Sequence, residues 1–129
     1  ADILHFYGVY ILITLLFISR KSSEILIGTT SLIFVYPILG LIWDYEADWN
    51  LITLDYNGFW TIGGFVKNLF YNGFHPAIPW TAFMLVGLWF GKQDLNDSKF
   101  VTKTLKTSFI VFVSLQILSK VVTMSSWLA

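Results

Sequence analysis

Long apolar runs separated by short polar segments dominate the pattern along this chain. An α-helix rises about 1.5 Å per residue, so about 20 apolar residues cross the hydrocarbon core of a bilayer. The pattern predicts membrane-spanning helices over about residues 3–19, 24–43, 77–91 and 105–127. We therefore expect an all-α membrane protein with about four transmembrane helices.

The segment between the second and third runs is more polar. Residues 44–57 interleave four acidic side chains with tryptophan and tyrosine, which is typical of a loop at a membrane interface. Residues 58–71 are apolar but are broken by glycines and Lys67, and we expect a short interfacial helix there. The Asn72-Gly73 pair that follows is a turn signal.

Small residues form a group in each of two predicted spans. Gly28 to Ser31 make a small, polar patch in the second span, and Gly87 and Gly91 are spaced as Gly-x-x-x-Gly in the third. In lipid, such residues usually face another helix because they let two backbones approach closely. Both groups therefore indicate helix–helix contacts within the protein.

The composition agrees with a membrane location. Of 129 residues, 56% are hydrophobic and 12% are charged, whereas soluble domains average about 25% charged residues. The lack of cysteine excludes disulfides and thiolate metal sites, and no His, Asp and Glu set has the spacing of a metal site. A net charge of zero gives no reason to expect a nucleic-acid partner. Because apolar sequence begins at once, we interpret residues 1–129 as a single transmembrane region of a longer chain.

Positive and negative charges alternate between the predicted loops. Bases follow the first and third spans, whereas acids predominate between the second and third. The positive-inside rule therefore places the basic loops in the cytoplasm and both ends of the chain on the other side. The expected cytoplasmic basic rim consists of Arg20, Lys21, Lys92, Lys99, Lys103 and Lys106. This rim suits contact with anionic lipids or, alternatively, docking of an anionic donor such as a coenzyme A.

Both histidines fall on the expected non-cytoplasmic side, and both are candidate catalytic residues. His75 precedes Pro76 at the start of the third span, where an imidazole can act as a general base or hold an acyl group. Asp2 and His5 are about one helical turn apart, so the carboxylate can orient the imidazole. The alternative for each histidine is a purely structural hydrogen bond.

Several other side chains are expected to line a cavity or a path within the membrane. An ionisable residue inside a span is a functional candidate, although Lys120 can also extend its stem to the outer interface. The expected cavity-lining residues are Asp2, Tyr7, Trp80, Gln116 and Lys120.

Two stretches carry a family resemblance. The first is Asp2–Tyr10 (DILHFYGVY), and the second is Phe74–Trp80 (FHPAIPW) with its continuation Gly87–Lys92 (GLWFGK). In order and spacing they resemble the middle region of a multi-pass membrane acyltransferase-like family. This family includes heparan-alpha-glucosaminide N-acetyltransferase and many uncharacterised bacterial membrane proteins.

The resemblance implies a larger helical bundle in a multi-pass protein of the bacterial inner membrane. It also implies transfer of an acetyl group from cytoplasmic acetyl-CoA to an acceptor, often a sugar, on the non-cytoplasmic side. The basic rim would face the donor, and the histidines would face the acceptor. The family's best-known catalytic histidine lies in more N-terminal spans, so neither His5 nor His75 corresponds to it. We therefore expect the chain to be a fragment without the main catalytic residues.

Two other functions fit the residues considered alone. A transporter or channel subunit would use Lys120, Gln116 and the Thr29–Ser31 patch to line a path, and it should show related halves or broken helices at the midplane. A non-catalytic membrane scaffold should tolerate His75→Ala. The lipid bilayer and the remaining helices of the same protein are the expected partners in every case.

Overall fold

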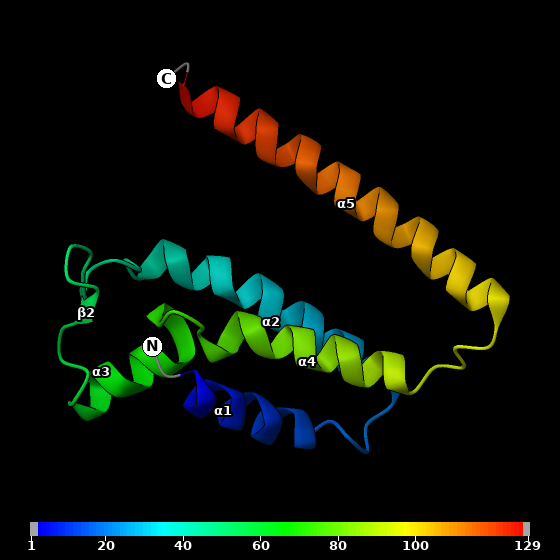
Figure 1. The fold of residues 1–129 in the computed structure, drawn as a ribbon, viewed down its shortest axis with the longest axis horizontal. Helices are drawn as coiled ribbons and strands as arrows, with labels where there is room; N and C mark the ends of the chain where they lie inside the picture. Colours follow the sequence, from blue (N-terminus) through cyan, green and yellow to red (C-terminus); the bar gives the residue numbers. More distant parts are fainter. Residues whose placement is uncertain (1–2, 128–129) are drawn as a thin grey trace. The chain divides into compact units, whose positions relative to one another are not determined.

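A computed structural model describes residues 3–127 (Figure 1). The chain divides into two units, the first ending at Lys92 and the second beginning at Gln93. The helices of the first unit are α1 (Leu4–Leu15), α2 (Ser22–Ile42), α3 (Ile62–Lys67), the π-helix η1 (Asn68–Asn72) and α4 (Ala77–Gly91). Between α2 and α3 the chain forms the short strands β1 (Trp49–Asn50) and β2 (Asp55–Tyr56). The second unit contains one long helix, α5 (Ser98–Trp127).

In the first unit α4 packs between α1 and α2 (Figure 1). A cluster of buried apolar side chains joins α1 to η1 and the start of α4, through Phe6, Tyr10, Leu69 and Ala77. On the other side of α4, Leu85 is fully buried, as is Ile25 of α2. Helix α4 thus contacts both α1 and α2, and its first turn is part of the buried core of the unit.

The first helix ends at Leu15, earlier than the predicted boundary at residue 19. The backbone then tightens, and the Phe17 amide donates to the carbonyl of Thr14 at 2.9 Å. This turn carries the Phe17 ring onto α2, where a Cβ at Gly28 would lie 2.7 Å from a ring atom. Because Gly28 has no side chain, it leaves room for the ring and for Leu85 of α4.

The small residues behave differently in the two helices. Thr29 is buried beside Gly28, as expected for a patch that faces another helix, whereas Thr30 and Ser31 are exposed. Gly87 and Gly91 have no neighbour within 4 Å of a built Cβ. The prediction of helix contacts is therefore confirmed for Gly28 and Thr29, and the Gly-x-x-x-Gly pair makes no close approach within the described residues.

The polar segment after α2 is more ordered than the expected loop. Its two strands pair antiparallel, with Trp49 opposite Tyr56. The expected short helix is present but begins later, as α3, with the Thr61 hydroxyl accepting a hydrogen bond from the Gly64 amide at 3.0 Å. It continues as η1 up to Asn72, which is the first residue of the predicted Asn72-Gly73 turn.

Helix length separates α2 and α5 from α1 and α4. Among the described residues, two helices are long and apolar enough to cross a membrane, namely α2 with 21 residues and the 27-residue Ser98–Met124 part of α5. Helices α1 and α4 are apolar but contain only 12 and 15 residues. The helical class is confirmed, whereas helix length alone supports fewer spans than the four expected.

Candidate functional site

The two histidines lie at one end of the first unit. Helices α1 and α4 run in the same direction (Figure 1), so His5 in the first turn of α1 and His75 just before α4 come to the same side. Lys92 lies at the opposite end, where its ammonium donates to the Arg20 carbonyl at 2.6 Å. Part of the predicted basic rim and both histidines are therefore at opposite ends of this three-helix unit.

The segment that carries His75 is held by three donors from elsewhere in the chain. The Tyr10 hydroxyl donates to the carbonyl of His75 itself at 2.5 Å. The Tyr45 hydroxyl donates to the Gly73 carbonyl at 2.8 Å. The Trp49 indole donates to the Asn72 carbonyl at 2.6 Å. These bonds fix the backbone on which the imidazole is mounted.

Asn72 is the centre of this arrangement. It is fully buried, with an exposed fraction of 0%. Its side-chain oxygen accepts from the Tyr56 hydroxyl at 2.8 Å, and its amide nitrogen donates to the Asp48 carboxylate at 3.1 Å. The same nitrogen donates to the Tyr45 carbonyl at 3.3 Å. A buried amide with all these partners ties the hairpin to η1 and specifies one arrangement of both.

An ion pair completes the network. The Lys67 ammonium lies 2.5 Å from the Asp48 carboxylate, and both side chains are about one-third exposed, at 30% and 32%. The hydrogen bond from Lys67, with further ones from Asn72 and Tyr56, holds the pKa of Asp48 below its usual value against the opposing effect of burial. Burial raises the pKa of the Tyr45 and Tyr56 phenols.

The π-helix places Asn72 in this position. Its final hydrogen bond runs from the Gly73 amide to the Asn68 carbonyl at 2.8 Å. A Cβ at Gly73 would lie 2.4 Å from that carbonyl oxygen, so only glycine fits without a backbone shift. Short π-helical segments are rare and often occur at functional sites.

His75 lines a pocket of about 250 Å³ with mainly aromatic walls. Its imidazole lies 5.1 Å, centroid to centroid, from the Trp80 ring. Tyr7 also lines this pocket, together with Tyr10, Phe83, Met84 and Ile3. The structure thus brings together three residues that the sequence predicted for the site, His75, Tyr7 and Trp80.

His5 faces a different space. It lines an open groove of about 430 Å³, walled mainly by aromatic side chains of the hairpin and the segment after it, among them Trp49, Tyr56 and Trp60. Phe6 lies close to both histidines, with centroid separations of 4.0 Å to His5 and 6.4 Å to His75. The two imidazoles are thus near the same phenyl ring but line separate cavities.

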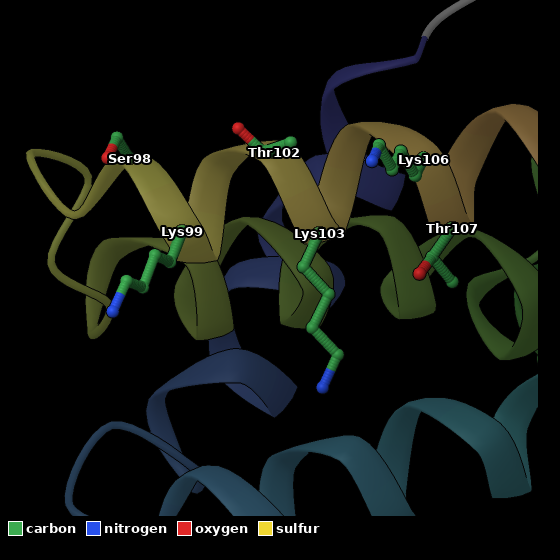
Figure 2. Close-up of a pocket in the computed structure, with 6 residues that line it drawn as sticks. All are labelled: Ser98, Lys99, Thr102, Lys103, Lys106 and Thr107. Carbon is green, nitrogen blue, oxygen red and sulfur yellow. The ribbon is translucent and has the colours of Figure 1, made fainter.

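The remaining predicted residues are placed elsewhere. Asp2 lies outside the described residues, so its proposed pairing with His5 stays a prediction. Gln116 and Lys120 are exposed on α5, in the second unit. Lys99, Lys103 and Lys106 also belong to α5, where they line one face (Figure 2).

Sequence reasoning did not identify the residues that hold the site in place. Tyr10, Tyr45, Asp48 and Asn72 act through contacts between positions 24 to 65 residues apart. A signal is present in the interleaving of acids and aromatic residues between residues 44 and 57, but the same pattern is typical of a membrane interface. Over residues 3–127, no group of three or more His, Asp and Glu side chains could hold a metal ion.

Comparison with known proteins identifies the family of the chain. The family model of the heparan-alpha-glucosaminide N-acetyltransferase catalytic domain matches residues 2–125. The chain belongs to this family. Neither a curated protein nor a solved structure gives a significant match. The resemblance inferred from Asp2–Tyr10 and Phe74–Lys92 is confirmed, and with it a membrane acetyltransferase-like family that uses acetyl-CoA as donor.

Proposed function

We propose that this chain forms part of a multi-pass acyltransferase of the bacterial inner membrane. It moves an acetyl group from cytoplasmic acetyl-CoA to an acceptor such as a sugar on the non-cytoplasmic side. The observation that carries the proposal is the His75 pocket, because a titratable imidazole is held by a fixed backbone against aromatic walls. Apolar pockets with a few oriented polar groups are the usual form of small-molecule sites.

In this proposal His75 contacts the acceptor. The imidazole takes the proton from an acceptor amine or hydroxyl as that group attacks the thioester carbonyl, and the coenzyme A thiolate leaves. The rings of Tyr7 and Trp80 provide flat apolar surfaces for the ring of the acceptor. The hydrogen bonds to the His75 segment support this role because they hold the base in one position.

The geometry of the first unit supports a donor and an acceptor at opposite ends. Helix α4 separates His75 from Lys92, and its 15 residues correspond to about 22 Å. Arg20 and Lys92 provide positive charge at the far end, where the phosphates of the donor would bind. The thioester end of the donor must therefore extend along most of the length of α4 to reach the pocket, where the acceptor attacks it.

The test is acetyl transfer by the intact protein in proteoliposomes that contain labelled acetyl-CoA, with amino sugars supplied on the opposite side. We expect His75→Ala to reduce transfer by about 100-fold or more, as for loss of a general base. His5→Ala is the matched control, because His5 lines the separate groove, and it should retain most of the rate. Equal rates for wild type and His75→Ala would remove His75 from the site, and no transfer by the wild type would overturn the function.

A further inference from the structure

Helix α5 is longer than a membrane span. Its 30 residues extend over about 45 Å, whereas the hydrocarbon core is about 30 Å thick. When α5 crosses a bilayer, about ten of its residues therefore lie outside the core. Residues 108–127 carry one charged side chain, Lys120, whereas the ten residues before them, 98–107, contain three lysines. The overhang is thus the N-terminal part of the helix.

The three lysines of this overhang lie on one face. Lys99, Lys103 and Lys106 are spaced four and three residues apart, which places them on one side of an α-helix. All three are exposed, and they line a shallow groove of about 470 Å³ with Ser98, Thr102 and Thr107 (Figure 2). The opposite face carries the apolar side chains of Val101 and Leu105.

Helix stability does not explain these lysines. Residues 98–127 contain no acidic side chain, so α5 has no internal ion pair that would neutralise them. Cations in the first turns of a helix also oppose the helix dipole. Asp97, just before α5, accepts a hydrogen bond from the Lys99 amide at 2.9 Å and places one negative charge at the start of the helix. Three lysines follow it within the overhang, so this end keeps an excess of positive charge that favours an external anion.

We propose that Lys99, Lys103 and Lys106 form a binding surface for the phosphate headgroups of anionic phospholipids. The overhang leaves the hydrocarbon core at the depth where these headgroups lie. Successive lysines are about one helical turn apart, so each can reach a different phosphate. Each lysine near an anionic surface strengthens the attraction by about fivefold, so the effect of three is large and sensitive to salt.

A lipid surface fits this face better than a soluble nucleotide does. The groove is shallow and lies along a single helix, and all of its lining side chains are exposed. Headgroups that exchange laterally need no enclosing walls, whereas a coenzyme A site would need an adenine pocket beside the phosphates.

The experiment measures lipid selectivity of the full chain in phosphatidylcholine vesicles by electron spin resonance. Spin-labelled phosphatidylglycerol is compared with spin-labelled phosphatidylcholine. We expect the wild type to prefer phosphatidylglycerol, and the triple variant Lys99→Gln, Lys103→Gln, Lys106→Gln to lose at least fivefold of this preference. The triple Lys→Arg variant is the matched control and should keep it. The preference of the wild type should also weaken when the salt concentration rises from 0.1 to 0.5 M. The Debye length is about 10 Å at 0.1 M and shortens as salt is added, so the attraction between lysines and headgroups is screened more strongly.

Two outcomes would overturn the proposal. Equal selectivity of the wild type and the triple Gln variant, with the same helix content by circular dichroism, would show that the lysines do not bind headgroups. Coenzyme A binding that falls in the triple Gln variant, without any change in lipid selectivity, would assign the surface to a soluble nucleotide instead. If the Gln variant does not fold, replacement of Lys103 alone provides the same comparison at a smaller effect.

Discussion

The His75 segment and the overhang of α5 place chemically active side chains in opposite ways. The carbonyls of residues 72, 73 and 75 each accept a hydrogen bond from a distant aromatic side chain, and the network behind them is centred on a fully buried amide. In residues 98–107 the three lysines are exposed and depend only on the helix that carries them. The His75 segment depends on contacts between residues that are far apart in the sequence. The overhang of α5 depends on three positive charges that lie close together on one helix face.

This difference predicts two kinds of response to substitution. Removal of one partner in a connected, buried network leaves other polar groups without partners, so the losses are large and not additive. Removal of one exposed lysine lowers a surface potential, so the losses are small, similar for each lysine and dependent on salt. The following changes, ordered by expected size, test this contrast.

The largest effect is expected from Asn72→Ala. The change removes the nearer acceptor of the Tyr56 hydroxyl, which keeps only its longer contact of 3.3 Å to Asp48, and it removes a buried donor to Asp48 and Tyr45. The free energy of unfolding should therefore fall by about 3 kcal/mol. Thermal unfolding in detergent measures this loss, and proteolysis between β1 and β2 should become faster. Lys103→Gln on α5 is the control and should alter the unfolding free energy by less than about 0.5 kcal/mol. Equal losses of unfolding free energy in Asn72→Ala and Lys103→Gln would contradict the difference between the buried network and the exposed lysines.

Gly73→Ala should be the next largest. A methyl group there would meet the Asn68 carbonyl at 2.4 Å, so the π-helical turn must shift, at a cost of about 2 kcal/mol. Gly87→Ala is the matched control, because a Cβ at Gly87 has no neighbour within 4 Å and alanine favours the helix. We expect Gly87→Ala to leave stability unchanged or to raise it slightly. If Gly73→Ala leaves the stability unchanged, the end of η1 can move without affecting the site.

The same contrast explains which features could be predicted from the sequence. The apolar runs predict the helices, and the bounds of the third run agree with α4 because Pro76 and Gly91-Lys92 mark its two ends. The early end of α1 was not predicted, because it depends on how Phe17 packs against Gly28. The role of Asn72 was not predicted either, because its partners lie 16 to 27 residues away and become neighbours only in the folded chain.

The candidate site shows the same division. His75, Tyr7 and Trp80 were identified from residue type and position, and they line one pocket. His5 was assigned to the same face correctly, but no pattern in the sequence indicates that it lines a separate groove. Side-chain type and helix ends therefore predict which end of the unit carries the two histidines, whereas the packing around Phe6 decides which cavity each imidazole lines.

Tyr10→Phe should have a smaller effect that is specific to the site. It removes the hydroxyl that donates to the His75 carbonyl and retains the ring, so the expected loss is about 1 kcal/mol of unfolding free energy. The local consequence is greater mobility of His75, which should increase the rate of its modification by diethyl pyrocarbonate. Tyr7→Phe, in the same pocket, is the control and should not change that rate. Identical modification rates in the two variants would show that this hydrogen bond does not position the imidazole.

The smallest effect is expected from Asp48→Asn, and it depends on pH. Lys67 holds the pKa of Asp48 below its usual value of 3.8, so the carboxylate contributes its full stabilisation above that pH. The contribution is lost as the pH falls below 3.8 through the lower pKa of the folded state. Because both side chains are about one-third exposed, Asp48→Asn should cost less than about 1 kcal/mol at pH 7.

Thermal unfolding from pH 7 to pH 3 should show a smaller acid-induced loss of stability in Asp48→Asn than in the wild type. Asp55→Asn is the matched control, because it removes a carboxylate from the same hairpin without touching the ion pair. This control should keep the acid-induced loss of the wild type. If the acid-induced loss is the same with and without the Asp48 carboxylate, the ion pair does not help to dock the hairpin, and the buried Asn72 contacts hold it alone.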